Sequence, residues 1–171
     1  FEPEVNISDE GGRWVFDGSN SKFRDVFRIW WRGSDLWLQT GTSFMGESSD
    51  GMTVRFSAEE LGLVKGKWLF VGFSVEKDGT AWGLVGPVTG GKPILKRAEV
   101  TGSGELPVSQ AKRFAIGGPL RKEPKAGNQI TVDQVALYPR GMAPAEILGA
   151  FELVASGKSL SKAITTAAQA R

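Results

Sequence analysis

The stretch that decides the fold is Gly127-Asn-Gln-Ile-Thr-Val-Asp133-Gln-Val-Ala-Leu-Tyr138-Pro-Arg-Gly-Met-Ala-Pro144-Ala-Glu-Ile147. Apolar side chains recur between its glycine and its tyrosine, which predicts one long strand over residues 130–138. A helix start follows at Pro144, because proline suits the first position of a helix. A carboxylate inside an apolar strand is costly unless something pairs with it. We therefore expect Asp133 to have a partner.

Working outward, most of the remaining sequence has strand character, with short apolar runs bounded by Gly, Asp, Asn and Pro. The other predicted strands are Trp14–Phe16, Val26–Arg32, Leu36–Gln39, Met52–Phe56, Lys67–Val75, Thr80–Val85, Glu99–Thr101 and Arg113–Ile116. Many short strands separated by turns indicate an all-β antiparallel sandwich. We expect one short helix that runs from Pro144 to Gly157, and a single helical turn at Ser57–Glu60, where the spacing fits a capping box.

Several motifs resemble laminin-G-like domains of the concanavalin A-like lectin/glucanase superfamily. These are the closing segment quoted above, the tryptophan-led strand Gly66–Val75, the Asp78–Gly79 turn with its return strand Thr80–Val85, Phe114-Ala-Ile-Gly117, and Phe16-Asp17-Gly18-Ser19. The resemblance covers about residues 14–152. It implies an antiparallel jelly-roll β-sandwich with a short C-terminal helix. It says little about function, because this fold hosts lectins, hydrolases and interaction modules.

Composition limits the chemistry that the chain can perform. At 171 residues it fits one domain, which we place at 1–157, followed by an Ala- and Thr-rich tail at 158–171 that serves as a docking segment or a linker. There are no cysteines and no histidines, so thiol nucleophiles and serine–histidine catalysis are excluded. No apolar run is long enough to span a membrane. We interpret Phe1 as a processed or excised start.

Charge is distributed unevenly along the chain. Residues 1–60 carry 11 acidic and 6 basic side chains, whereas residues 92–125 carry 8 basic and 3 acidic ones. Such asymmetry suits contact with an anionic partner or with a complementary protein surface, and the alternative is that these are solvated loop charges. Nucleic-acid binding is not expected, since prolines interrupt the basic residues and no binding motif is present.

Glycosidase activity is an unfavoured alternative. Glucanases of the superfamily use a Glu-x-Asp-x-x-Glu strand, in which alternation places the carboxylates on one face. The nearest string here runs from Glu76 through Asp78 to Ala81, and it lacks the last carboxylate. Asp78 with Gly79 is better explained as a hairpin turn. We therefore expect no enzymatic activity.

Aromatic side chains are the first candidate site. Alternation in Val26–Arg32 places Phe27, Ile29 and Trp31 on one face and Arg28, Trp30 and Arg32 on the other. The first set is expected in the core, together with Trp14 and Trp68. The second set could form an exposed platform that binds a sugar ring or a partner, and Trp37 and Trp82 could join it.

A structural calcium ion is the second candidate. In the glucanase branch of the superfamily, the aspartate that matches Asp133 helps to hold calcium with backbone carbonyls from near the amino terminus. The resemblance therefore implies a site formed by Asp133, Asp17 and Gly18, with the Glu2–Pro3 region nearby. The alternative is that Asp133 accepts hydrogen bonds from backbone amides without any metal.

The leading functional expectation is a non-catalytic module of an exported protein that is secreted, periplasmic or on the cell surface. Within that class, attachment to a protein partner in an envelope or surface assembly ranks first. Binding of a glycan through exposed tryptophans ranks second, because polar residues able to orient sugar hydroxyls do not cluster visibly around Trp30. Glycoside hydrolysis ranks last.

Overall fold

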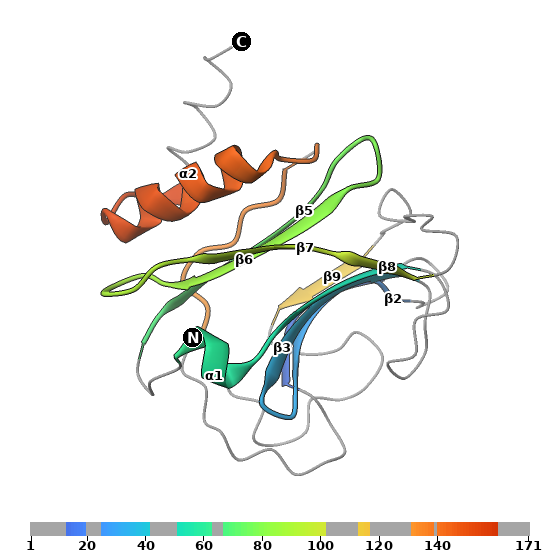
Figure 1. The fold of residues 1–171 in the computed structure, drawn as a ribbon, viewed down its shortest axis with the longest axis horizontal. Helices are drawn as coiled ribbons and strands as arrows, with labels where there is room; N and C mark the ends of the chain where they lie inside the picture. Colours follow the sequence, from blue (N-terminus) through green and yellow to red (C-terminus); the bar gives the residue numbers. More distant parts are fainter. Residues whose placement is uncertain are drawn as a thin grey trace.

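The computed structural model describes residues 13–19, 25–41, 51–62, 67–101, 113–116, 131–138 and 140–160. The ribbon in Figure 1 shows how the sheets and helices of this part are arranged. In chain order the elements are β1 Arg13–Ser19, β2 Asp25–Arg32, β3 Asp35–Gly41, β4 Gly51–Phe56, α1 Ala58–Leu61, β5 Leu69–Val75, β6 Ala81–Pro87, β7 Ile94–Arg97, β8 Glu99–Thr101, β9 Arg113–Ile116 and α2 Pro144–Ala155. The prediction of a mostly β chain with one longer C-terminal helix is confirmed.

The described strands form two antiparallel sheets. Sheet A has six strands in the order β8-β4-β3-β2-β1-β9, and sheet B has three in the order β5-β6-β7. The chain crosses from one sheet to the other between β7 and β8, where the amide of Ala98 donates to the carbonyl of Ala81 over 2.8 Å. This crossing closes one side of the molecule. On the opposite side lie β9 at the edge of sheet A and β5 at the edge of sheet B.

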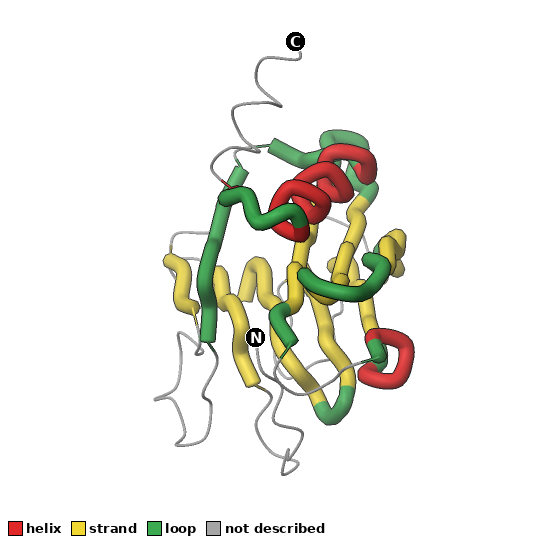
Figure 2. The backbone as a smooth tube through the Cα atoms, turned by 90° about the vertical axis from the view of Figure 1, so that its left-hand side faces the viewer, coloured by secondary structure: helices red, strands yellow, loops and turns green. Residues whose placement is uncertain are grey.

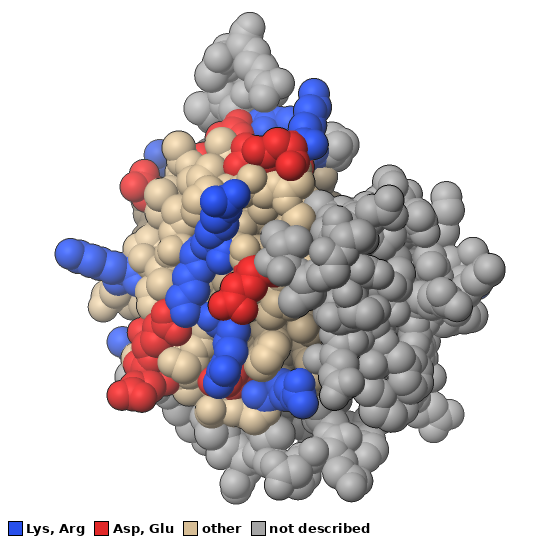
Figure 3. Space-filling view, turned by 45° about the vertical axis from the view of Figure 1, so that its right-hand side comes forward, with Lys and Arg blue, Asp and Glu red and all other residues tan. Residues whose placement is uncertain are grey.

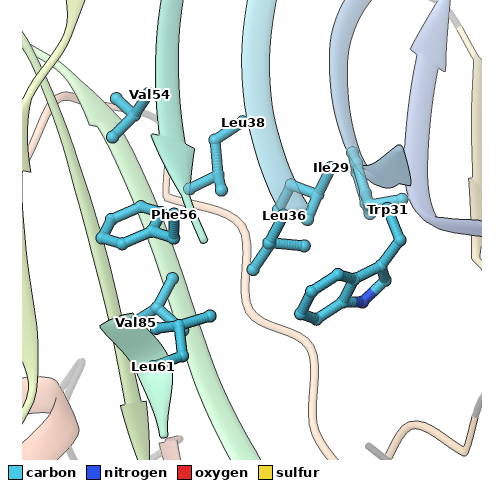
Figure 4. Packing of buried hydrophobic residues seen from close by; sticks show 9 residues of the cluster. Ile29, Trp31, Leu36, Leu38, Val54, Phe56, Leu61 and Val85 are labelled. Carbon is cyan, nitrogen blue, oxygen red and sulfur yellow. The ribbon is translucent and has the colours of Figure 1, made fainter. Parts of the chain in front are cut away.

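The main core lies between the two sheets, which pack face to face as in a β-sandwich. Figure 4 shows apolar side chains from β2, β3, β4, β6 and α1 pointing into the same space. Leu38, Phe56 and Val85 are fully buried there. The predicted inward face of β2 is confirmed, since Ile29 and Trp31 belong to this cluster and Phe27 packs against it.

A glycine on β6 sets how closely the sheets approach. A Cβ atom at Gly83 would lie 2.9 Å from Cγ1 of Val54 and 3.2 Å from Cε2 of Phe56. Real Cβ atoms essentially never lie under 3.0 Å from such a neighbour, so the first contact could not form without a shift. The sheets can therefore pack at this distance only because residue 83 has no side chain.

α2 forms a third layer on the outer face of sheet B. It begins with Pro144 at its first turn, and the carboxylate of Glu146 accepts a hydrogen bond from the amide of Ala143 over 2.9 Å. Its buried residues are Ile147, Ala150 and Phe151, spaced at three and four residues as one helix face requires. They pack with Leu84 of β6 in a second apolar cluster. The predicted helix start is thus confirmed.

The two short-range turn predictions are also confirmed. Ser57 caps α1 in a capping box with Glu60, with each side chain hydrogen-bonded to the other residue's backbone. Asp78 and Gly79 form the turn between β5 and β6, where the amide of Thr80 donates to Asp78 Oδ1 over 2.8 Å. This bond and a second one from the Thr80 hydroxyl lower the pKa of Asp78.

The strand prediction for residues 130–138 is wrong within the part that is described. Residues 131–138 are extended but belong to neither sheet, and Ile130 lies outside the described residues. Figure 2 shows the segment as a straight loop tube that runs alongside the strands toward α2. Alternating apolar residues make a strand only when an edge pairs with them, and here none of the described strands does.

Candidate functional site

The outer face of sheet A carries the predicted platform residues, but two of them are buried. Trp30 exposes 9% of its surface and Arg28 only 5%. Their side chains point to the predicted face, away from the inter-sheet core. The expectation that this face leaves Trp30 open is therefore wrong. Alternation assigns a side chain to a face of a sheet, but it does not reveal what covers that face.

A polar cluster centred on Gln39 explains how these side chains tolerate burial. Gln39 Oε1 accepts hydrogen bonds from Trp30 Nε1 over 2.8 Å and from Arg28 Nε over 2.9 Å. Its amide nitrogen donates to Thr53 Oγ1 over 3.2 Å. In the strand register Asp17, which is 1% exposed, lies directly opposite Arg28. Gln39 was not among the predicted site residues, although a polar side chain inside an apolar strand was a usable signal.

Trp37 and Arg32 are the predicted platform residues that remain near the surface. The guanidinium groups of Arg32 and Arg55 lie 5.6 Å and 5.5 Å from the centre of its ring. Arg55 also forms an ion pair with Asp35 at 2.5 Å. The Trp37 Nε1 atom is buried and has no hydrogen-bond partner in the described part of the chain. Arg32 is exposed, so this end of the face presents positive charge beside a half-buried indole ring.

Trp82 does not join this group, because it lies on sheet B. It packs into the cluster beneath α2, and its Nε1 atom donates to Glu76 Oε1 over 2.8 Å. Glu76 is thereby engaged with Trp82, and Asp78 with its own turn. The five predicted binding residues do not form one surface.

The predicted calcium ligands are not brought together by the described contacts. Asp133 is exposed, and its one described hydrogen bond comes from the neighbouring Gln134 side chain over 3.4 Å. Asp17 is buried on β1, and a Cβ atom at Gly18 would meet Phe114 and the carbonyl of Phe27. Within the described ranges no three acidic or other metal-ligating side chains gather. Glu2 and Pro3 lie outside the described residues, so the calcium site stays a prediction.

In the described part of the chain, the side opposite the Ala98 crossing has β5 and β9 as unpaired sheet edges, and we call it the open side. A cavity of about 450 Å³ lies there, bounded by both sheets, by segment 131–138 and by α2. Among the described residues, the large apolar side chains that expose 37–59% of their surface are Trp68, Phe114, Ile116, Val132, Val135 and Leu137. All but Phe114 line this cavity. Trp68 was expected in the core and instead exposes 44% of its surface.

The wall of the cavity near α2 contains Tyr138, which is half-buried. Burial raises the pKa of Tyr138, and Arg140 nearby partly offsets that effect. The hydroxyl of Tyr138 is buried and has no hydrogen-bond partner among the described residues. Arg140 itself forms a two-pronged pair with Glu146 that ties this end of the segment to α2.

Charge on the surface is mixed. Figure 3 shows Lys and Arg side chains standing next to Asp and Glu side chains on the face in view. Lys96, from the basic stretch of the sequence, forms an ion pair with Glu60 at 2.5 Å and donates to the carbonyl of Arg55. At least one charge of that stretch is therefore neutralised within the fold.

Comparison with family models, with curated proteins and with solved structures finds no match for this chain. The longer helix of the described part has 12 residues. No helix in these ranges has the length and apolar character needed to cross a membrane.

Proposed function

We propose that this chain is a non-catalytic attachment module of an exported protein, and that it binds a protein partner through its open side. The observation that carries the proposal is the gathering of exposed apolar side chains around one cavity. Large exposed apolar patches are uncommon on soluble proteins and mark interaction surfaces. The partner belongs to a larger envelope or surface assembly.

For the fold we propose a concanavalin A-like jelly roll of the laminin-G type. Two antiparallel sheets, the Asp78–Gly79 hairpin and the helix that begins at Pro144 support this assignment. The motifs from Gly66 to Val75 and from Phe114 to Gly117 add to it. Export to the periplasm, the cell surface or the medium follows from the same resemblance.

Attachment ranks above glycan binding because two of the predicted platform tryptophans are covered, whereas apolar side chains are exposed elsewhere. A sugar-stacking platform needs exposed indole rings, whereas Trp30 is buried and Trp82 packs beneath α2. The open side, in contrast, offers aliphatic and aromatic surface with few polar groups. Surfaces of that composition form the centre of protein interfaces.

Carbohydrate binding keeps one specific observation in its favour. Arg32 and Arg55 flank the half-buried ring of Trp37 on the outer face of sheet A. A sugar that carries a carboxylate could pair with Arg32 beside this ring. A glycan array with the purified protein tests this second candidate, and Arg32→Ala with Trp37→Ala should abolish any signal.

The attachment proposal is tested by affinity capture from the cells that make the protein. The bait is compared with a Val135→Asp/Leu137→Asp variant, which adds two negative charges to the open side. The matched control is Thr89→Asp/Lys92→Gln, which lowers the net charge equally on an exposed loop far along the chain. We expect the wild type and the control to retain the same protein, and the apolar-surface variant to lose it at least about tenfold. Equal retention by all three baits would refute the proposal.

A further inference from the structure

The cavity on the open side is long and narrow. Its lining includes every residue of β5 from Leu69 to Ser74 and all of segment 131–138. Six strand residues extend over about 20 Å, and a volume of about 450 Å³ is distributed along this length. Segment 131–138 is one wall of the cavity, so this volume is space that remains beside the chain's own segment. A cavity of this size is within the range of pockets that bind small molecules.

α2 runs along the cavity in the direction opposite to β5. Just before the helix begins, the amide of Met142 donates to Ser74 Oγ over 2.5 Å. Two turns into the helix, the ring of Phe151 lies 5.8 Å from the ring of Phe70. Lys158 follows the last turn of the helix and also lines the cavity. It therefore lies toward the end of the cavity at which β5 begins.

The two ends of the cavity differ in exposure. At the end where α2 begins, Ser74 and Met142 are buried, and so is the hydroxyl of Tyr138. At the end where β5 begins, Trp68 exposes 44% of its surface and Lys158 is exposed. Solvent therefore reaches the cavity at the Lys158 end, and buried side chains bound it at the other end.

Charge is placed at the exposed end of an otherwise apolar lining. Lys158 is the one cationic side chain among the described residues that line the cavity, and it forms no ion pair in the described part of the chain. Asp133, the one anionic side chain of this lining, already accepts a hydrogen bond from the Gln134 side chain over 3.4 Å. Most of the other lining residues are aliphatic or aromatic. Such a pocket takes an apolar body and orients it with a few polar groups.

We propose that this cavity binds a long-chain fatty acid, with the alkyl chain along β5 and the carboxylate at Lys158. A linear alkyl chain matches the narrow apolar space, and its removal from water supplies most of the affinity. A charge-assisted hydrogen bond from Lys158 fixes the orientation. Fatty-acid binding goes beyond the attachment function and does not depend on it, because the ligand occupies the cavity and a protein partner contacts the side chains exposed around it.

The test separates the charged head from the alkyl chain. The whole chain is mixed with dansyl-labelled undecanoic acid, and this fluorescent probe is displaced with dodecanoate or with dodecan-1-ol, which has the same chain without the charge. Lys158→Gln removes the cation, and Lys92→Gln, at an exposed lysine outside the lining, is its matched control. We expect Lys158→Gln to weaken dodecanoate binding about threefold to tenfold and to leave dodecan-1-ol binding unchanged. Lys92→Gln should change neither.

A second pair of variants tests the location. Ala136→Phe adds a ring to the cavity wall, whereas Thr89→Phe adds the same ring at an exposed position outside the lining. Melting curves verify that both variants fold. We expect Ala136→Phe to weaken the binding of both ligands at least tenfold, because it occupies their space, and Thr89→Phe to weaken neither.

Three outcomes would overturn the inference. The first is that the wild type binds neither the probe nor dodecanoate. The second is that folded Ala136→Phe binds both ligands as the wild type does, which would place them elsewhere on the protein. The third is that Lys158→Gln binds dodecanoate with unchanged affinity, and this arm can be read whether or not Ala136→Phe folds, since Lys158 is exposed. Failure of the capture experiment with intact fatty-acid binding would reject the attachment function alone.

Discussion

Gln39 shows how a single polar side chain can organise a covered sheet face. Its carbonyl oxygen accepts from an indole and a guanidinium, and its amide donates to a threonine on the next strand. Buried polar groups that are all paired fix strand register, because a slipped strand would leave each of them without a partner. The cluster is therefore better understood as a structural element than as a binding surface.

The burial of Trp30 predicts a large effect on stability. Trp30→Ala should lower the free energy of unfolding by about 3–5 kcal/mol, since it removes a buried aromatic ring and its bond to Gln39. Trp68→Ala is the matched control, and its side chain is 44% exposed, so about 1 kcal/mol or less is expected. Urea unfolding curves measure both. A small loss for Trp30→Ala would restore it as an open platform residue.

Glu60 is expected to make a pH-dependent contribution to the free energy of unfolding. Partial burial acts to raise its pKa, but Lys96 and the backbone and hydroxyl of Ser57 outweigh this effect, so the pKa lies below 4.5. A carboxyl whose pKa is lowered by folding contributes stability above its unfolded-state pKa, and this contribution is lost as the pH falls through the folded-state value. Glu60→Gln keeps a residue suited to the capping box while removing the charge.

Glu60→Gln should therefore cost about 0.2–1 kcal/mol of unfolding free energy near neutral pH and almost nothing near pH 3. Urea unfolding at the two pH values measures the difference. Glu59→Gln is the control, because Glu59 belongs to the same turn and has no ion pair within the described part of the chain. An equal cost at both pH values would show that the ion pair with Lys96 contributes nothing.

At the scale of elements, α2 can approach sheet B closely because Gly72 of β5 has no side chain. A Cβ atom at Gly72 would lie 2.8 Å from Cγ2 of Ile147, so β5 and α2 approach closely at this point. A Cβ atom at Gly149, within α2, would meet nothing within 4 Å. Gly72 is therefore required by the packing of α2 on β5, whereas Gly149 is not.

Alanine substitution should separate those roles. Gly72→Ala should destabilise the fold by about 1–3 kcal/mol through overpacking. Gly149→Ala should stabilise it by about 0.5–1 kcal/mol, because alanine favours the helix interior more than glycine does. Denaturant titration of the two variants gives both values. If Gly72→Ala were neutral, the helix would have to be free to move away from β5.

Some of these elements could be predicted from local sequence, and others could not. Local signals were sufficient for the Asp78 turn, the Ser57 cap and the helix start, since each depends on residues a few positions apart. β7 was missed, because Pro93 and two basic residues obscure a strand of four residues. The strand prediction for residues 130–138 was wrong for another reason. Whether an extended segment pairs depends on strand edges that are distant in the sequence, and no local pattern records these.

The candidate site was likewise predictable only where local sequence decides the structure. Alternation correctly assigned Trp30 to the outer face and Trp31 to the core. It could not predict that Trp30 would be covered, that Trp68 would be exposed, or that Trp82 would lie in another layer. These properties depend on the packing of layers that are far apart in the sequence.

At the scale of the whole molecule, the end of the described chain is tied to the open side. The amide of Leu160 donates to Gln134 Oε1 over 2.8 Å, and its side chain packs against the cluster beneath α2. The predicted tail, 158–171, therefore begins with residues that contribute to the fold. Residues 161–171 lie outside the described part, and their role in docking stays a prediction.

Two truncations test this division. Deletion of residues 161–171 should leave the melting temperature within a few degrees of the wild type, since the described packing ends at Leu160. Deletion of residues 159–171 should lower it further, because the Leu160 contacts are lost. Differential scanning calorimetry measures both. Unfolding on removal of 161–171 alone would show that the tail is integral to the domain.

The strand order of sheet A has a consequence for the path by which the chain folds. β1 to β4 are neighbours along the chain as well as in the sheet, whereas β8 and β9, the two outermost strands, come from much later in the sequence. Pairing of distant segments is slow, because the loop must close before any contact compensates for the lost entropy. The four-strand meander is therefore the region to nucleate first. β9 joins late on β1, and it is also the strand from which the sheet would first unravel.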